Sequence, residues 1–289
     1  MLMWLILACL SALFAGLMSI TAKMGIKHTD SNVATAIRTI VVLIFSWIMV
    51  FITGQQQGLS AIDGRGVLFL VLSGLATGAS WLCYFRALQL GDVNKVVPID
   101  KSSTVLTIIL AILFLNETVN GLKIAGMVLL LSGALLMIDK KSGSQAAAKD
   151  GRWLMYAVGS AVFAALTSIL AKVGMQGIAS NLATALRTAV VLVMAWVVVL
   201  VTGKTKDVAK IPRRELLFIC ISGLMTGASW LCYFAALKAG PASVVVPIDK
   251  LSVLLTVAFS VFILHEKMSL KAWLGLGLLA IGTLCMVFA

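Results

Sequence analysis

Apolar residues gather into ten blocks along the chain, each about 20 residues long and separated from the next by a short polar stretch. A helix of about 20 residues, rising 1.5 Å per residue, crosses a hydrocarbon layer about 30 Å thick. The pattern predicts an all-α, polytopic membrane protein with ten transmembrane helices. We expect these helices near residues 2–22, 33–53, 66–90, 94–115, 120–138, 153–173, 182–202, 215–238, 243–264 and 270–288.

The composition agrees with this pattern and excludes a water-soluble core. Hydrophobic residues make up 61% of the 289 residues and charged residues 12%, against about 45–50% and about 25% in soluble domains. The net charge of +12 does not indicate a nucleic-acid partner, because nucleic-acid binders gather their basic residues on a surface that faces water. No basic residue precedes the first apolar block, so we expect a mature helix there and no cleavable signal peptide.

Basic residues in the loops indicate how the chain is oriented. If both termini lie on one face, the loops of the opposite face contain 13 basic residues: Lys27, Lys95, Lys140, Lys141, Lys149, Arg152, Lys204, Lys206, Lys210, Arg213, Arg214, Lys267 and Lys271. The loops on the face of the termini contain three: Arg65, Lys123 and Lys238. Short cytoplasmic loops are enriched in Lys and Arg. We therefore expect a multi-pass plasma membrane protein (the inner membrane, in a bacterium) with both termini external.

Neither metal nor enzyme chemistry is indicated by the sequence. The five cysteines lie inside predicted helices without a C-x-x-C spacing, which is typical of cysteines that act as small apolar side chains. His28 and His265 are isolated, and neither H-E-x-x-H nor G-x-S-x-G occurs. We expect no cofactor, no bound metal and no catalytic activity.

An internal duplication is the clearest feature of the chain. Shifting the sequence by 149 residues aligns the two halves without a gap. SGLATGASWLCYF at 73–85 returns as SGLMTGASWLCYF at 222–234, and VVPIDK occurs at both 96–101 and 245–250. Matches of this density along the chain identify two copies of one structural unit.

The duplication predicts two inverted five-helix repeats. We expect the first repeat over residues 1–138, a polar cytoplasmic linker over 139–152 and the second repeat over 153–289. Because five is odd, the second copy begins on the opposite side of the membrane from the first. Inverted repeats recur in secondary transporters, where two equivalent halves exchange roles and present one site to each side in turn. A channel would also need a polar lining, but paired charges near both ends are more typical of gates.

The chain resembles the drug/metabolite transporter superfamily, EamA type, over nearly its whole length. The resemblance is carried by proline-bearing fourth helices (Pro98, Pro247), by the acid that closes each of them (Glu117, Glu266) and by glycine-bearing fifth helices. Each half also resembles half-length EamA-like proteins with a PIDK motif, as if the chain were their tandem fusion. This resemblance implies ten helices and the export or exchange of small metabolites through a central cavity.

Charged residues within the predicted helices are candidates for gates, because each costs about 2.5–3.5 kcal/mol at the bilayer centre and so faces the bundle interior or a wet cavity. At 1.5 Å per residue, one set lies about 8–10 Å inside the cytoplasmic edge: Lys23, Arg38, Asp100 and Lys101. Inversion places the equivalent set near the external edge: Lys172, Arg187, Asp249 and Lys250. The alternatives are structural ion pairs or, for the long basic side chains, snorkelling to the interface.

Polar and aromatic residues near the middle of the helices are candidates for solute binding. Each aspartate begins a stripe on one helix face, made by Ser103 and Thr107 in the first repeat and by Ser252 and Thr256 in the second. Deep aromatic pairs at i, i+3 spacing could stack on a solute or bind a cation: Trp81 with Tyr84, and Trp230 with Tyr233. Helix packing or contact with lipid is the alternative role for the aromatic residues.

These features together predict a secondary transporter for a small metabolite, working as a monomer or homodimer in the lipid bilayer. Bases outnumber acids inside the predicted helices, which favours an anionic or zwitterionic, amino acid-like solute. Glu117 and Glu266 are candidates for ion coupling. The alternative is a lipid-carrier flippase component, or a membrane protein that holds a phosphate head group with its basic layers.

Overall fold

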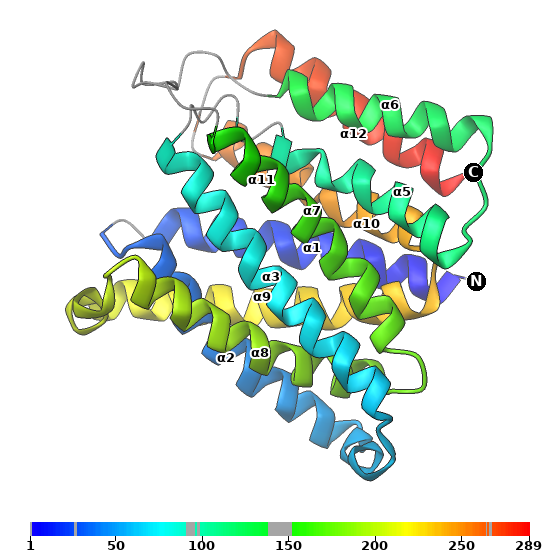
Figure 1. The fold of residues 1–289 in the computed structure, drawn as a ribbon. Coiled ribbons are helices and arrows are strands. Elements are labelled where there is room, and N and C mark those ends of the chain that lie inside the picture. The colour runs from blue at the N-terminus through cyan, green and yellow to red at the C-terminus, as the bar shows by residue number, and fades with distance from the viewer. Residues whose placement is uncertain are drawn as a thin grey trace.

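The computed structural model describes residues 2–25, 28–90, 96, 99–137, 152–263, 265 and 268–289, and every regular element among them is helical. The first repeat forms α1 (Leu2–Gly25), α2 (Ser31–Ile52), α3 (Gly64–Leu90), α5 (Ser103–Leu115) and α6 (Gly121–Leu136) (Figure 1). The second forms α7 (Arg152–Gly174), α8 (Ser180–Val201), α9 (Arg213–Ala239), α10 (Ala242–Lys250), α11 (Ser252–Phe262) and α12 (Leu270–Val287). The 3₁₀ helices η1 (Gln55–Ala61) and η3 (Thr205–Lys210) precede α3 and α9.

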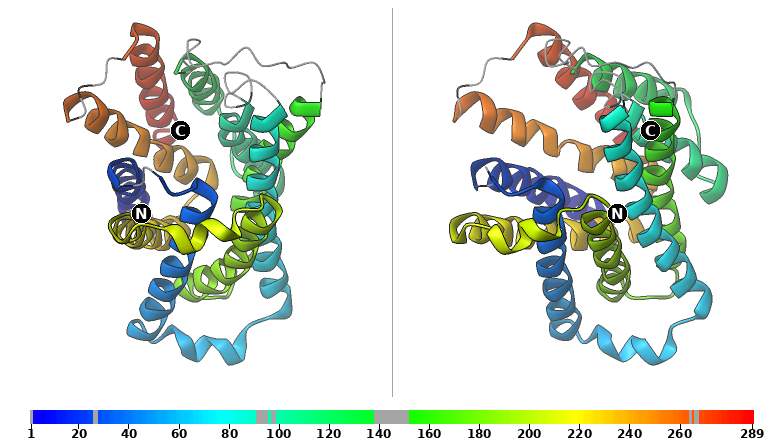
Figure 2. Two further views of the ribbon diagram at one scale, coloured as in Figure 1. Left: turned by 90° about the vertical axis from the view of Figure 1, so that its left-hand side faces the viewer. Right: turned by 60° about the vertical axis from the view of Figure 1, so that its left-hand side comes forward.

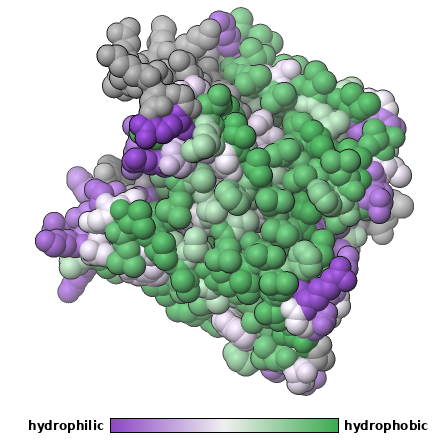
Figure 3. Space-filling view, viewed as in Figure 1, coloured by the Kyte–Doolittle hydropathy of each residue, from purple (hydrophilic) through white to green (hydrophobic). Residues whose placement is uncertain are grey.

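The described helices are those of a multi-pass membrane protein. Eight helical stretches are long and apolar enough to cross a membrane, one of them running through α10 and α11, and α6 is a shorter apolar helix. Apolar side chains cover the middle of the visible surface and polar ones gather at its edges (Figure 3). Of the predicted fourth span the structure describes residues 96 and 99–115, so the count of ten stays a prediction. The predicted linker lies outside the described residues, apart from Arg152 at the start of α7.

The bundle has two faces that its loops and ends define. Both ends of the chain lie on the same side, which we call the terminal face (Figure 1). The opposite side carries η3 and the start of α9, and we call it the basic face. Its described residues include Lys204, Lys206, Lys210, Arg213 and Arg214.

Helices of one repeat pack mainly on helices of the other. α1 lies along α9, and α3 lies along α7. α2 packs on α8 at one edge of the bundle, and α6 packs on α12 at the opposite edge (Figures 1 and 2). The 149-residue shift converts the α1–α9 pair into the α7–α3 pair. The two repeats are therefore interleaved and share one core.

Glycines allow these helices to approach closely. A Cβ at Gly74 would lie 2.7 Å from Cβ of Val190, and a Cβ at Gly223 would lie 2.8 Å from Cβ of Val41. These two contacts are equivalent under the 149-residue shift. Small residues at such contacts are typical of closely packed transmembrane helices.

The fourth helix of each repeat is interrupted directly after its PIDK motif. The amide of Leu251 donates to the carbonyl of Ile248 at 2.9 Å, three residues back, and α11 begins afresh at Ser252. Ser102, the equivalent of Leu251, donates to Ile99 in the same way at 3.2 Å. Lys101 and Lys250 therefore lie at helix breaks, whose backbone groups are freer to meet a ligand than those of a continuous helix.

A proline lies inside the fourth helix of the second repeat. α10 begins at Ala242, which makes Pro247 an interior residue of the helix. It has no N–H to donate to the carbonyl of Ser243, four residues earlier, so it weakens the hydrogen bonding within α10. Pro98 lies outside the described residues.

Candidate functional site

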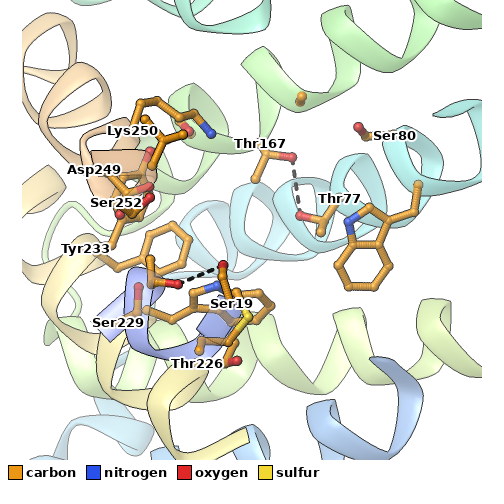
Figure 4. A pocket seen from close by; sticks show the side chains of 18 of the residues that line it. Ser19, Thr77, Ser80, Thr167, Thr226, Ser229, Tyr233, Asp249, Lys250 and Ser252 are labelled. Carbon is orange, nitrogen blue, oxygen red and sulfur yellow. Dashed lines mark hydrogen bonds between the residues drawn. The ribbon is translucent and has the colours of Figure 1, made fainter. Parts of the chain in front are cut away.

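A cavity of about 530 Å³ lies between the two repeats and is lined by both. Seven helices contribute to its wall: α1, α3, α7, α8, α9, α10 and α11. Asp249 and Lys250 lie on one side of it and Thr77 and Ser80 on the other (Figure 4). Among the described residues, its charged lining consists of three bases and one acid: Lys101, Arg187, Lys250 and Asp249. The cavity therefore carries a formal excess of two positive charges.

The cavity brings together nine of the residues predicted from the sequence. Besides the four charged residues, these are Trp81, Trp230, Tyr233, Ser252 and Thr256. Hydroxyl groups that the sequence analysis did not single out as site residues also line it, including Ser19, Thr77, Ser80, Thr167, Ser168, Thr226 and Ser229. Four of these hydroxyl residues could have been identified from the sequence by their proximity to a tryptophan on the same helix, one turn away or less: Thr77, Ser80, Thr226 and Ser229.

Seven predicted residues lie elsewhere. Tyr84 packs in an apolar cluster with Ala87 and Val96. Ser103 and Thr107 lie on α5, where the Thr107 hydroxyl donates to the carbonyl of Ser103 at 2.8 Å. The polar stripe of the second repeat thus lines the cavity, and that of the first does not.

The remaining four are the charged residues Lys23, Arg38, Asp100 and Lys172. Lys23 is exposed at the end of α1. Arg38 lines a separate cavity of about 170 Å³, and its guanidinium donates to the sulfur of Met18 and the hydroxyl of Thr35. Asp100 and Lys172 each belong to a hydrogen-bonded cluster.

Each aspartate accepts a hydrogen bond from a serine of the other repeat. The Ser11 hydroxyl donates to Oδ1 of Asp249 at 2.6 Å, and the Ser160 hydroxyl donates to Oδ1 of Asp100 at 2.8 Å. A second serine supports each of these: Ser229 donates to the carbonyl of Ser11, and Ser80 donates to the carbonyl of Ser160, both at 3.1 Å. The two clusters are equivalent under the 149-residue shift. The sequence analysis did not identify these serines as partners of the aspartates.

Arg187 is held inside the bundle by hydroxyls and aromatic rings. It is 2% exposed. Its Nε donates to the Ser73 hydroxyl at 2.9 Å and its Nη2 to the Thr77 hydroxyl at 2.6 Å. The guanidinium carbon lies 4.4 Å from the ring centre of Phe234 and 5.3 Å from that of Trp230. Its Nη1 is buried and has no hydrogen-bond partner among the described residues.

A cluster around Glu117 lies at the terminal face, beside the start of α10. The Glu117 carboxylate accepts from the amides of Ala242 at 2.6 Å and Ser243 at 3.0 Å, and its Oε1 lies 3.3 Å from Nζ of Lys172. Lys172 also donates to the carbonyl of Gly240 at 2.6 Å. A carboxylate at a helix N-terminus satisfies amides that have no partner within the helix. We call these five residues the Glu117 cluster.

The Glu117 cluster keeps its acid charged. Burial alone would raise the pKa of the Glu117 carboxyl, but hydrogen bonds from Ser243, the nearby Lys172 ammonium and a hydrogen bond from Ala242 outweigh burial and lower this pKa below its usual value. The cluster ties the ends of α7 and α9 to the α5–α6 loop and the start of α10. It therefore lies between the cavity and the terminal face.

Comparison with known proteins agrees with this architecture. A half-length protein of Sinorhizobium sp., described as an uncharacterized transporter in the cobO 3' region, is 50% identical over 134 residues, which are 46% of this chain and 95% of that one. An uncharacterized protein of Methanocaldococcus jannaschii is 29% identical over 103 residues, 32% of this chain and 75% of its own. A solved structure, described only as the crystal structure of a protein, has a TM-score of 0.78 at 15% identity over 98% of this chain and 96% of that one, which shows a shared fold.

The sequence profile of the EamA-like transporter family matches the chain twice, over residues 2–139 and 151–288. These two matches cover nearly all of the sequence and correspond to its two repeats. The chain is therefore a membrane transporter that belongs to the EamA-like transporter family.

Proposed function

We propose that this protein is a secondary transporter that moves a small anionic or zwitterionic metabolite across the membrane by alternating access, in export or exchange. The observation that carries the proposal is the cavity between the two repeats. It combines an excess of positive charge with hydroxyl groups and two tryptophans, Trp81 and Trp230. Sites of this kind suit a solute that has an anionic group and an apolar part.

Alternating access is supported by the way the repeats pair. Helix pairs related by the 149-residue shift surround the cavity, so an exchange of conformations between the repeats would move its opening from one face to the other. This mechanism rests on ten spans and on inversion of the second repeat, and both are parts of the proposal. We orient the terminal face outwards because the loops of the opposite face carry most of the basic residues.

We propose that the charge layers act as gates and that the Glu117 cluster closes the terminal end. The charge layer of the second repeat comprises Lys172, Arg187, Asp249 and Lys250. Its counterpart comprises Lys23, Arg38, Asp100 and Lys101. Support comes from the Glu117 cluster, which joins four segments between the cavity and the terminal face.

The test is transport by the purified protein in proteoliposomes without any partner protein. Uptake is measured for radiolabelled amino acids and organic acids, with counterflow to detect exchange. We expect saturable flux of at least one anionic or zwitterionic solute. A protein that moves no soluble solute in this assay, yet binds a lipid-linked phosphate, would instead be a flippase component.

A further inference from the structure

The guanidinium of Arg187 is only partly satisfied. An arginine carries five N–H donors, and the described partners of Arg187 are two hydroxyls, on Ser73 and Thr77. Its Nη1 has no partner among the described residues although the side chain is 2% exposed. A buried charged donor without an acceptor is costly. Three of its N–H donors, including both on Nη1, therefore have no hydrogen-bond acceptor among the described residues, and the side chain lines the cavity.

The surroundings fix this guanidinium in one orientation. Ser73 and Thr77 hold its Nε and Nη2 groups, and Phe234 lies 4.4 Å from its carbon. Fixing a guanidinium beforehand lowers the entropy lost when it binds a planar anion. Aromatic rings are poor acceptors for the remaining N–H groups, because they offer only a quadrupole to the cation. An anionic oxygen is the partner that Nη1 fits best.

We propose that Arg187 anchors the anionic group, a carboxylate or a phosphate, of the solute that this transporter carries. The inference rests on the proposed transport function and names the chemistry that its central site recognises. Trp230 and Phe234 line the cavity beside the guanidinium and contact an apolar part of the same solute. Lys250 adds positive charge to the cavity, so the site prefers a net anion to a neutral molecule.

The equivalent arginine of the first repeat has different surroundings. Arg38 corresponds to Arg187 under the 149-residue shift, but its described contacts are with Met18 and Thr35. The hydroxyls equivalent to those of Ser73 and Thr77 belong to Ser222 and Thr226, and both donate to carbonyls of their own helix. In this conformation only the second repeat presents an arginine to the central cavity.

Binding to the purified full-length protein in nanodiscs tests the proposal directly. The probes are citrate, L-glutamate, phenylpyruvate, inorganic phosphate and phenyl phosphate, each as the sodium salt at constant ionic strength. Binding is followed by the melting temperature and by tryptophan fluorescence, since Trp230 lies 5.3 Å from the guanidinium. The carboxylates and the phosphates form separate arms that distinguish the two anions.

We expect at least one probe to bind the natural protein and Arg187→Gln to weaken that binding at least tenfold. Arg187→Lys keeps the charge but loses the fixed planar group, and we expect it to weaken binding as well. Arg86→Gln is the control and retains the affinity, because Arg86 is exposed on α3 and lies outside both the cavity lining and the proposed gates. Size-exclusion profiles and melting temperatures without probe establish that each variant is folded.

Three results would overturn the proposal: unchanged affinity in folded Arg187→Gln and Arg187→Lys, an equal loss in Arg86→Gln, or no binding of any probe to the natural protein. Flux in proteoliposomes separates this inference from the proposed function. A probe that binds through Arg187 but is not transported contradicts transport and leaves the anchor in place. A probe that is transported with unchanged KM by Arg187→Gln contradicts the anchor alone.

Discussion

Glu117→Gln should open the terminal end of the protein. The substitution keeps the shape of the side chain but removes the charge that holds Lys172 and replaces one accepting oxygen with an N–H₂ donor. In the structure the carboxylate receives two amides, from Ala242 and Ser243, and an ammonium. Its side chain is only 9% exposed, so water cannot readily replace the lost contacts.

The size of the effect follows from these contacts. A hydrogen bond to a charged group contributes about 1.5–3 kcal/mol, and a charge at a partly buried helix terminus contributes up to about 2 kcal/mol. Glutamine can still accept one of the two amide hydrogens, so we take a net loss of about 2–3 kcal/mol for the closed state. At a factor of ten per 1.4 kcal/mol, the ratio of open to closed protein rises roughly 30- to 150-fold.

Cysteine labelling measures this ratio. Val244 is 5% exposed and lies on α10 directly beyond the capped residues. Val244→Cys is introduced into a protein in nanodiscs whose natural cysteines are replaced: Cys9, Cys83, Cys220, Cys232 and Cys285. We expect Glu117→Gln to raise the labelling rate of the introduced cysteine by a maleimide towards the calculated factor.

A matched carboxylate on the basic face is the control. Glu215 accepts from the amides of His28 at 3.0 Å and Thr29 at 2.9 Å, a similar capping contact at the other end of the bundle. Glu215→Gln should leave the labelling of the cysteine at 244 unchanged. If Glu117→Gln has no larger effect than Glu215→Gln, the Glu117 cluster does not close the terminal end.

Four further predictions concern the titration of Glu117, the two aspartates, the two tryptophans and the orientation of the chain. Because the pKa of Glu117 lies below its usual value of 4.5, the labelling rate at 244, divided by that of a fully exposed cysteine at the same pH, should stay constant above pH 4.5 and rise only as the pH falls through the lowered pKa; a change in this ratio between pH 6 and 8 would contradict the prediction. Asp249→Asn should favour opening to the terminal face and Asp100→Asn to the basic face, and equal labelling changes at both mouths would identify structural ion pairs. Trp81→Ala and Trp230→Ala should each impair flux in a folded protein; normal transport by both refutes the central aromatic site. A C-terminal tag should react with an impermeant reagent in intact cells, and protection would reverse the orientation.

The fold class could be predicted because helix length, apolar content and duplication are local properties that the chain displays directly. Depth within the predicted helix placed Trp230 near the centre, where it lines the cavity, whereas the same argument placed Asp249 near the external edge. The partners of the charged residues could not be predicted. Arg187 meets Ser73 and Thr77, which are more than 100 residues away in sequence, and only the packing of α8 on α3 brings them together.

The sequence also did not predict that equivalent residues of the two repeats have different surroundings. Duplication predicts equal surroundings for Arg38 and Arg187, and the structure gives them different partners. One sequence motif can occupy two environments when the two halves adopt different conformations, and the sequence does not say which half adopts which.

The contacts between the repeats also constrain how a ribosome and an insertion machinery can build this molecule. Asp100 finds its hydroxyl donor on Ser160, 60 residues later in the chain, and Ser11 finds its acceptor on Asp249, 238 residues later. The first repeat must therefore enter the bilayer with an aspartate that has no donor yet and with α1 lacking α9. Assembly is postponed until most of the chain has been synthesised, and early helices depend on lipid or on a chaperone to shield their polar groups until then.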